Sequence, residues 1–189
     1  MLILVTGGSR SGKSRFAQGL AQQRPGPHAY VATAEALDAE MKARIESHRR
    51  SRPAGWAVVE EPIRVSEAVR VALGSARTVV LDCVTLWMSN LILADETFGE
   101  RRAEERAEEL VKASQDAPGG ALVVVTNEVG SGVVPDSLLG RRFRDCAGRA
   151  NEVIARSADE VYLLVSGIPL RIKPQEGAGS GGGRVERNG

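Results

Sequence analysis

A glycine-rich loop between an apolar run and a helical pattern constrains the fold more than any other feature. Residues 7–14 read Gly-Gly-Ser-Arg-Ser-Gly-Lys-Ser and satisfy the pattern GxxxxGK[ST]. The apolar run Leu2–Val5 precedes them, and a helix is predicted over Lys13–Gln23. Glycines let the backbone N–H groups turn inward on phosphates, and the helix adds its positive end. The context predicts a bound nucleoside triphosphate, with Lys13 on the β- and γ-phosphates and the Ser14 hydroxyl on Mg²⁺.

The rest of the chain alternates short apolar runs with helix-like stretches. We expect strands at Leu2–Val5, Tyr30–Ala32, Val79–Leu81, Ala121–Val125 and Val161–Val165. We expect helices at Lys13–Gln23, Asp38–Arg50, Arg64–Leu73, Leu86–Leu93, Glu100–Gln115 and Leu138–Ser157. Continuous apolarity indicates strands that are covered on both faces, as crossover helices of a parallel sheet produce. The pattern predicts a three-layer α/β fold of the P-loop NTPase type, with a mostly parallel central sheet flanked by helices.

Composition narrows the classes of protein. A length of 189 residues favours one domain, and 25 Lys+Arg against 24 Asp+Glu gives a net charge of +1, which does not favour nucleic acid. Two cysteines and two histidines without a CxxC exclude a zinc or disulfide framework. No apolar run approaches the ~20 residues of a membrane span. We expect a soluble cytoplasmic protein whose domain covers residues 1–174, followed by a flexible glycine-rich tail at 175–189. A GxGxxG match in that tail has neither a strand before it nor a helix after it, and we regard it as accidental.

A second candidate for nucleotide chemistry is Asp82, which ends the apolar run Val79–Leu81. P-loop proteins supply a carboxylate to the magnesium ion from such a strand end. The alternative is that Asp82 caps the helix that follows it, because aspartate is a favoured N-cap residue. Both roles could hold together.

The third candidate is His48, which lies among four arginines in Arg44–Pro53. One interpretation is a basic helix end, since cations are favourable near a helix C-terminus. The other is a nucleophilic imidazole, kept neutral by arginines that also bind phosphates. Met41, Ile45 and His48 share one helix face, but the spacing does not choose between the two interpretations.

Taken together, these motifs closely resemble the bifunctional adenosylcobinamide kinase/adenosylcobinamide-phosphate guanylyltransferase family of cobalamin biosynthesis. The resemblance runs from Met1 to about Lys173 and is carried by Gly7–Ser14, Tyr30–Ala34, Glu40–Ile45, His48–Pro53, Trp56, Glu60, Leu81–Trp87, Thr126–Gly130, Val134–Pro135, Arg142–Asp145 and Ala158–Val161.

The resemblance implies two reactions on one scaffold. ATP or GTP phosphorylates the aminopropanol hydroxyl of adenosylcobinamide, and GTP then transfers GMP to that phosphate with loss of pyrophosphate. The second step implies a covalent histidine–GMP intermediate at His48, with Lys13 acting in catalysis and Mg²⁺ held through Ser14 and Asp82. It also implies a homo-oligomer, a trimer, whose small-molecule substrates are adenosylcobinamide, adenosylcobinamide phosphate, GTP and ATP.

The family's nucleotide contacts also carry over to this chain by position. They fall on Gly7, Gly8, Ser9, Arg10, Ser11, Gly12, Lys13, Ser14, Ala32, Thr33, Ala34, Arg49, Arg50, Ser51, Arg52, Glu60 and Asp82. Glu60 could instead be a solvated acid at a strand end, and Thr33 a plain strand residue. The segment Asn127–Gly130 ends the fifth strand, where ligands of open α/β sheets collect, so corrinoid or γ-phosphate contacts are expected there. Arg142 and Arg144 could assist, although two arginines on a long helix are more often solvated.

Three other functions remain to be weighed. A GTP-dependent switch protein reads guanine with Asn-Lys-x-Asp, whereas this chain carries Asn-Glu-Val after the run Ala121–Val125. Nucleic-acid binding through Arg141–Arg144 lacks a basic net charge and an RNA-binding motif. A monofunctional kinase of a small metabolite stays open if His48 is structural, and only labelling of the protein decides it.

Overall fold

The computed structural model describes residues 1–36 and 38–174, apart from the side chains of residues 40, 44 and 51. The predicted tail at 175–189 lies outside the described residues. In chain order the elements are β1 (Leu2–Gly7), α1 (Lys13–Gln22), β2 (His28–Ala32), α2 (Ala39–Ser51), β3 (Ala57–Glu60), α3 (Val65–Ser75), β4 (Thr78–Asp82), α4 (Val84–Ala94), α5 (Glu100–Gln115), β5 (Ala121–Val125), α6 (Leu138–Ser157), β6 (Glu160–Val165) and β7 (Ile168–Lys173).

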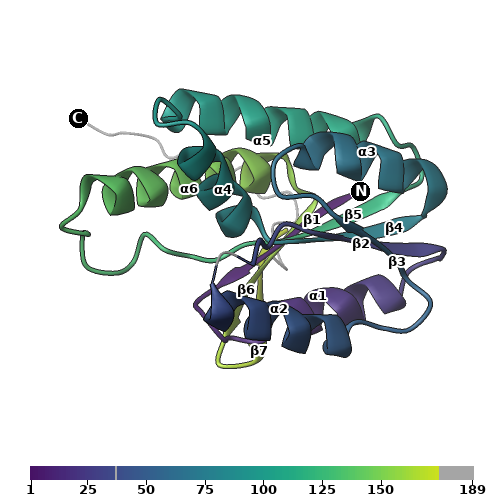
Figure 1. Ribbon diagram of the computed structural model, residues 1–189. Coiled ribbons are helices and arrows are strands. Elements are labelled where there is room, and N and C mark those ends of the chain that lie inside the picture. The colour runs from purple at the N-terminus through teal and green to yellow at the C-terminus, as the bar shows by residue number, and fades with distance from the viewer. Residues whose placement is uncertain (37, 175–189) are drawn as a thin grey trace, which may run out of the picture.

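The strands form one sheet in the order β3-β2-β4-β5-β1-β6-β7 (Figure 1). All neighbouring strands are parallel except β6 and β7, which form an antiparallel hairpin. Asp82 pairs with both Ala32 of β2 and Val125 of β5. The carboxyl ends of these central strands therefore meet at one edge of the sheet, beside the loop that follows β1.

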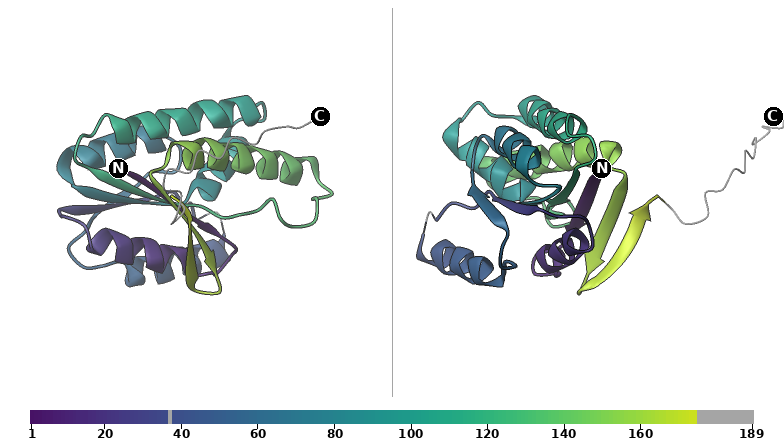
Figure 2. Two further views of the ribbon diagram at one scale, coloured as in Figure 1. Left: turned by 180° about the vertical axis from the view of Figure 1, so that it is seen from behind. Right: turned by 90° about the vertical axis from the view of Figure 1, so that its right-hand side faces the viewer.

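Helices cover both faces of the sheet, which confirms the predicted three-layer α/β fold. Helices α3 to α6 lie on one face, and α1 and α2 lie on the other (Figures 1 and 2). Leu2 and Leu4 of β1 belong to the core beneath the first group, while Ile3 and Val5 belong to the core beneath α1. This alternation of core contacts explains why every residue of β1 is buried.

Strands β3 and β7 lack a continuous run of buried apolar residues because they lie at the edges of the sheet. The residues of β3 are exposed or only half-buried, and β7 is exposed along most of its length. An edge strand is covered on fewer sides, so it needs no continuous apolar run. The prediction of five strands was therefore short of the seven in the described sheet.

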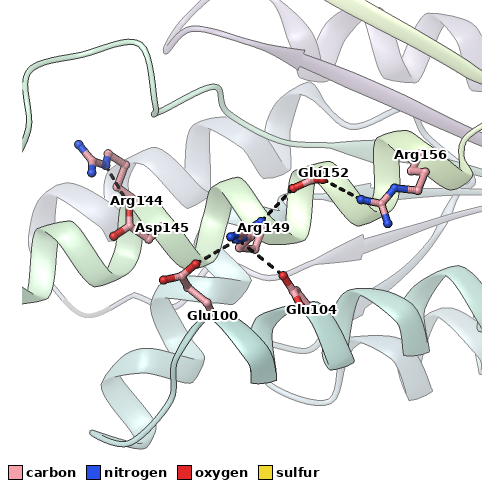
Figure 3. A network of polar contacts seen from close by, with 7 residues as sticks. All are labelled: Glu100, Glu104, Arg144, Asp145, Arg149, Glu152 and Arg156. Atoms are coloured by element: carbon pink, nitrogen blue, oxygen red, sulfur yellow. Dashed lines mark hydrogen bonds and ion pairs between the residues drawn. The ribbon is translucent and has the colours of Figure 1, made fainter.

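Ion pairs connect α5 and α6 on the outer surface (Figure 3). Arg149 of α6 lies 3.0 Å from Glu100 and 3.6 Å from Glu104 of α5. The same helix pairs Arg144 with Asp145 at 3.1 Å, and the Arg142 guanidinium donates to the backbone oxygen of residue 96. Both Arg142 and Arg144 are half-buried and have protein partners, whereas the alternative interpretation expected solvated side chains.

Among the helices of residues 1–36 and 38–174, none combines the length and apolarity that crossing a membrane requires.

Candidate active site

The loop between β1 and α1 has a backbone path that depends on glycine. Gly7 adopts a φ of +146°, and a Cβ there would lie 2.4 Å from the Leu164 backbone oxygen. Gly12 is the N-cap of α1 with a φ of +90°, and it makes no side-chain capping bond. Glycine has no side chain that could cap the first N–H groups of α1. These groups are therefore available to bind an anion at the start of the helix.

Lys13 lies almost buried at the start of α1. Its ammonium donates to the Gly8 backbone oxygen at 2.6 Å, which places the charge against the loop itself. The loop is also tied to its surroundings, since the Glu128 amide donates to Gly7 and the Gly167 amide donates to Ser11, each at 3.0 Å. The loop is thus held by β1, by the segment after β5 and by the β6–β7 turn.

A cavity of about 720 Å³ opens between this loop, α1, α2 and the ends of β2 and β4. Of the residues that the family resemblance names, it is lined by Arg10, Ser11, Gly12, Lys13, Ser14, Ala32, Ala34, His48, Arg52, Glu60 and Asp82. Arg15 adds a further cation. Four cationic side chains against two carboxylates among the described lining residues suit a polyphosphate ligand.

Helix α2 brings His48 to the phosphate loop. Asp38 caps the helix by accepting a hydrogen bond from the Met41 amide at 2.7 Å. Met41, Ile45 and His48 all line the cavity, as the predicted helix face required. The Nδ1 atom of His48 lies 4.0 Å from Oδ2 of Asp82. Residues that are 34 positions apart in the sequence are thereby neighbours in one site.

Asp82 is hydrogen-bonded by the side chain of Tyr30. The Tyr30 hydroxyl donates to Oδ2 of Asp82 at 2.5 Å. Burial raises the pKa of Tyr30 and the Asp82 charge raises it further, so the phenol stays protonated and remains a donor. The alternative role of Asp82 as a helix cap is wrong, since Cys83 is the N-cap of α4 and no side chain caps that helix.

The donors at this edge fit a magnesium ion. Ser14 and Asp82 offer one hydroxyl and one carboxylate to the same cavity. Mg²⁺ in nucleotide sites takes one or two protein oxygens and completes its shell with phosphate oxygens and water. In the described part of the chain no three His, Cys, Asp or Glu groups gather closely enough to hold a metal by themselves, so a magnesium ion here needs the phosphates.

The neighbouring thiol does not compete as a nucleophile. Cys83 lines the cavity, but burial raises the pKa of its thiol to about 11. Few thiolates exist at neutral pH under that condition, and the thiolate is the reactive form.

Glu60 is engaged by arginines of α2. It accepts two hydrogen bonds from Arg49, at 3.0 and 2.7 Å, and lies 3.6 Å from Arg52. The hydrogen bonds from Arg49 are the largest influence that lowers the pKa of the Glu60 carboxyl, which keeps it ionised. The Arg52 guanidinium lies over the Tyr30 ring at 4.8 Å. Glu60 is therefore more than a solvated acid at a strand end, because it fixes the two arginines beside the cavity.

Several predicted contacts lie away from the cavity. The Thr33 side chain is fully buried and exchanges two 2.8 Å hydrogen bonds with the Cys83 backbone, a structural arrangement. Arg50 is largely exposed and lies 4.0 Å from Glu46. The lining of the cavity does not include Gly7, Gly8, Ser9 or Arg49, and the side chain of Ser51 is outside the described part.

The cavity is also lined by residues outside the nucleotide contacts that the resemblance implies. Tyr30 and Asn127 belong to motifs that carry the resemblance, whereas Gln18 belongs to none of them. Asn127 donates to the Thr85 hydroxyl at 2.8 Å, so the segment after β5 reaches the site as expected. Gln18 follows Ser14 by one helical turn, and this i, i+4 spacing was the available signal.

The loop, the sheet order and the cavity together define a P-loop nucleotide-binding protein of the α/β class. The described fold aligns with a solved ATPase of the type III secretion system of pathogenic bacteria at a TM-score of 0.55 and 13% identity. That alignment covers 87% of this chain and 51% of the ATPase chain, and it shows the fold alone.

The sequence places the chain within a particular family of this class. It belongs to the cobinamide kinase / cobinamide phosphate guanyltransferase family, whose model matches residues 3–172. Two relatives named bifunctional adenosylcobalamin biosynthesis protein CobU are 44% identical, from Escherichia coli K12, and 42% identical, from Salmonella typhimurium. Each alignment spans 92% of this chain and the whole relative. The protein CobP of Pseudomonas aeruginosa is 40% identical over 90% of this chain and 96% of the relative.

Proposed function

We propose that this chain catalyses two successive transfers at the cavity between α1 and α2. ATP or GTP phosphorylates the aminopropanol hydroxyl of adenosylcobinamide. GMP then passes from GTP to adenosylcobinamide phosphate through a covalent His48–GMP intermediate, which yields adenosyl-GDP-cobinamide and pyrophosphate. The observation that carries this proposal is the presence of His48 in the same cavity as Lys13 and the phosphate loop.

In the kinase step the oxygen of the substrate hydroxyl attacks the γ-phosphorus, the bond between that phosphorus and the β,γ-bridging oxygen breaks, and the hydroxyl proton is released. Lys13 and the N–H groups at the start of α1 offset the charge that develops on the phosphate oxygens. Ser14 and Asp82 would hold Mg²⁺, which supplies further charge neutralisation when it is bound. These groups serve both steps, because both use a triphosphate in the same loop.

In the guanylyl step a nitrogen of His48 attacks the α-phosphorus of GTP. A P–N bond forms, the P–O bond to the β-phosphate breaks, and pyrophosphate leaves. We assign the attack to Nε2, since Nδ1 lies on the side of Asp82 at 4.0 Å. An oxygen of the substrate phosphate then attacks the same phosphorus, breaks the P–N bond and releases His48.

The distribution of charged residues along the cavity suits the binding of GTP in both steps. Arg10 belongs to the loop and Lys13 and Arg15 to the first turn of α1, while Arg52 and Glu60 lie on the side of α2 and β3. The first group matches a polyphosphate. The second group offers a donor and an acceptor, and a carboxylate such as Glu60 can accept the N–H groups of a guanine edge.

The test is to incubate the protein with Mg²⁺ and GTP labelled at the α- or the γ-phosphate, denature it, and measure retained label. We expect acid-labile, alkali-stable label from the α-position alone, absent in His48→Ala. The His48 variant should keep kinase activity, whereas Lys13→Ala should lose both activities by on the order of 10²-fold or more.

The second histidine of the chain provides the matched control. The imidazole of His28 lies 2.9 Å from the Ala21 backbone oxygen, in contact with the end of α1, and does not line the cavity. His28→Ala should therefore retain the label if it stays folded. No label from either position in a protein that binds GTP would favour a monofunctional kinase with a structural His48.

We further propose that the chain works in the cytoplasm as a homo-oligomer, a trimer, with residues 1–174 as its catalytic domain. Both cysteines are free and buried, which suits a reducing compartment. The exposed apolar residues Ile168, Leu170 and Ile172 on the edge strand β7 support association between copies.

A further inference from the structure

A polar side chain on α1 faces the cavity without a protein partner. Gln18 is only 9% exposed and belongs to the lining of the cavity. Within the part of the chain that the structure describes, its carboxamide makes no hydrogen bond. Its polar atoms are not among the fully occluded side-chain atoms without a partner, so the carboxamide keeps some accessible surface. Because buried amides almost always have hydrogen-bond partners, this one is expected to find its partner in a ligand.

The place of Gln18 on α1 indicates which part of a nucleotide it meets. It lies four residues after Ser14, about 6 Å further along the helix axis. The phosphates of a bound nucleotide lie at the N-terminus of that helix, at Gly12 and Lys13. A side chain one turn beyond them, in the same cavity, is beside the half of the ligand that follows the α-phosphate.

The opposite wall carries groups of matching character. Arg52 extends from the end of α2 over the Tyr30 ring, and its Nε atom is buried without a hydrogen-bond partner among the described residues. Glu60 lies beside it at the end of β3. Gln18, Tyr30, Arg52 and Glu60 all line the cavity, so a ligand between α1 and α2 meets a carboxamide on one side and a charged pair on the other. A nucleoside, with its sugar hydroxyls and its donors and acceptors on the base, is complementary to such walls.

We propose that Gln18 hydrogen-bonds the nucleoside of bound GTP and thereby contributes affinity that the phosphate loop does not supply. This inference rests on the proposed use of GTP and adds a residue of α1 to its recognition. The carboxamide has both a donor and an acceptor, so it can serve either the sugar hydroxyls or the edge of the base.

The decisive variant is Gln18→Met, which keeps the volume and removes the hydrogen-bonding groups. Titration calorimetry with Mg²⁺ should show about tenfold weaker GTP binding and pyrophosphate binding within about twofold of the parent, because pyrophosphate fills only the phosphate loop. The melting temperature without ligand should be unchanged or higher, since an unpaired buried amide is replaced by an apolar group. Gln22→Met, the same change at an exposed position of α1, is the control and should alter none of these.

Three GTP analogues separate the possible contacts. If the sugar is the partner, 2′-deoxy- or 3′-deoxy-GTP should bind the parent and Gln18→Met alike. If the exocyclic amino group of the base is the partner, inosine triphosphate, which lacks that group, should bind the parent and Gln18→Met with equal affinity.

Unchanged GTP affinity in Gln18→Met would overturn the inference, as would equal weakening of GTP and pyrophosphate. A lower melting temperature without ligand, together with unchanged binding, would make Gln18 structural. These binding measurements do not depend on the covalent adduct. A parent that binds GTP but forms no His48–GMP would contradict the proposed chemistry and leave the assignment of Gln18 standing.

Discussion

Replacing Gly7 with alanine is expected to displace the backbone of the phosphate loop at its first residue. A methyl group there would lie 2.4 Å from the Leu164 backbone oxygen and 3.0 Å from the Ser11 hydroxyl. The oxygen cannot retreat easily, because Gly7 pairs with Leu164 in the β1–β6 ladder. Alanine would also have to adopt a φ of +146°. Either the ladder or the loop must therefore move.

The magnitude follows from these two costs. A strained backbone conformation costs about 1–3 kcal/mol, and an overpacked side chain costs about the same. A combined loss of about 4 kcal/mol corresponds to a melting temperature roughly 8–16 °C lower in a domain of this size. GTP binding should weaken as well, because the shifted loop no longer aims its N–H groups at one point.

The neighbouring glycine offers a matched control. A Cβ at Gly8 would meet no atom within 4 Å, and Gly8 has no left-handed φ. Gly8→Ala should change the stability by less than about 1 kcal/mol. Thermal unfolding followed by circular dichroism compares the two variants with the parent. A Gly7→Ala protein that melts within about 2 °C of Gly8→Ala would refute the reasoning, since the loop path would then tolerate a side chain.

Two further substitutions test the polar contacts. Tyr30→Phe removes the hydrogen-bond donor to Asp82 and should lower the free energy of unfolding in denaturant by about 2 kcal/mol, because it leaves a largely buried carboxylate short of a hydrogen bond. Tyr162→Phe removes a less buried hydroxyl and should cost less in the same denaturant experiment. Equal costs would contradict the importance of the hydrogen bond between Tyr30 and Asp82. The pKa of Asp95 is lowered from 3.8 to about 2, and the hydrogen bond from Arg102 is the largest cause. A carboxyl group with a lowered pKa stabilises the fold at any pH above its pKa in the unfolded chain. That stabilisation is lost as the pH falls through its pKa in the folded protein. Asp95→Asn should therefore unfold more readily than the parent at pH 7, with a difference that shrinks between about pH 4 and pH 2, and a constant difference across that range would contradict the pairing.

The sequence by itself determined the features that depend on neighbouring residues. The phosphate loop of residues 7–14 is readable because its glycines, lysine and serine act within one turn of the chain. The central strands β1, β4 and β5 are readable because burial on both faces demands continuous apolar residues. The resemblance of the motifs correctly predicted the family, and half of the residues that line the cavity are among the site residues that it implied.

The tertiary structure decided the features that depend on packing between distant segments. It brought His48 of α2 to Asp82, placed Tyr30 beneath that carboxylate, and turned Thr33 to a structural hydrogen bond. It also exposed Gln18 to the cavity, where no motif marks it. A residue type fixes which bonds a side chain can make, whereas the crossing of helices over the sheet fixes which partners are within reach. Local sequence patterns therefore predict the chemistry of this site better than its geometry.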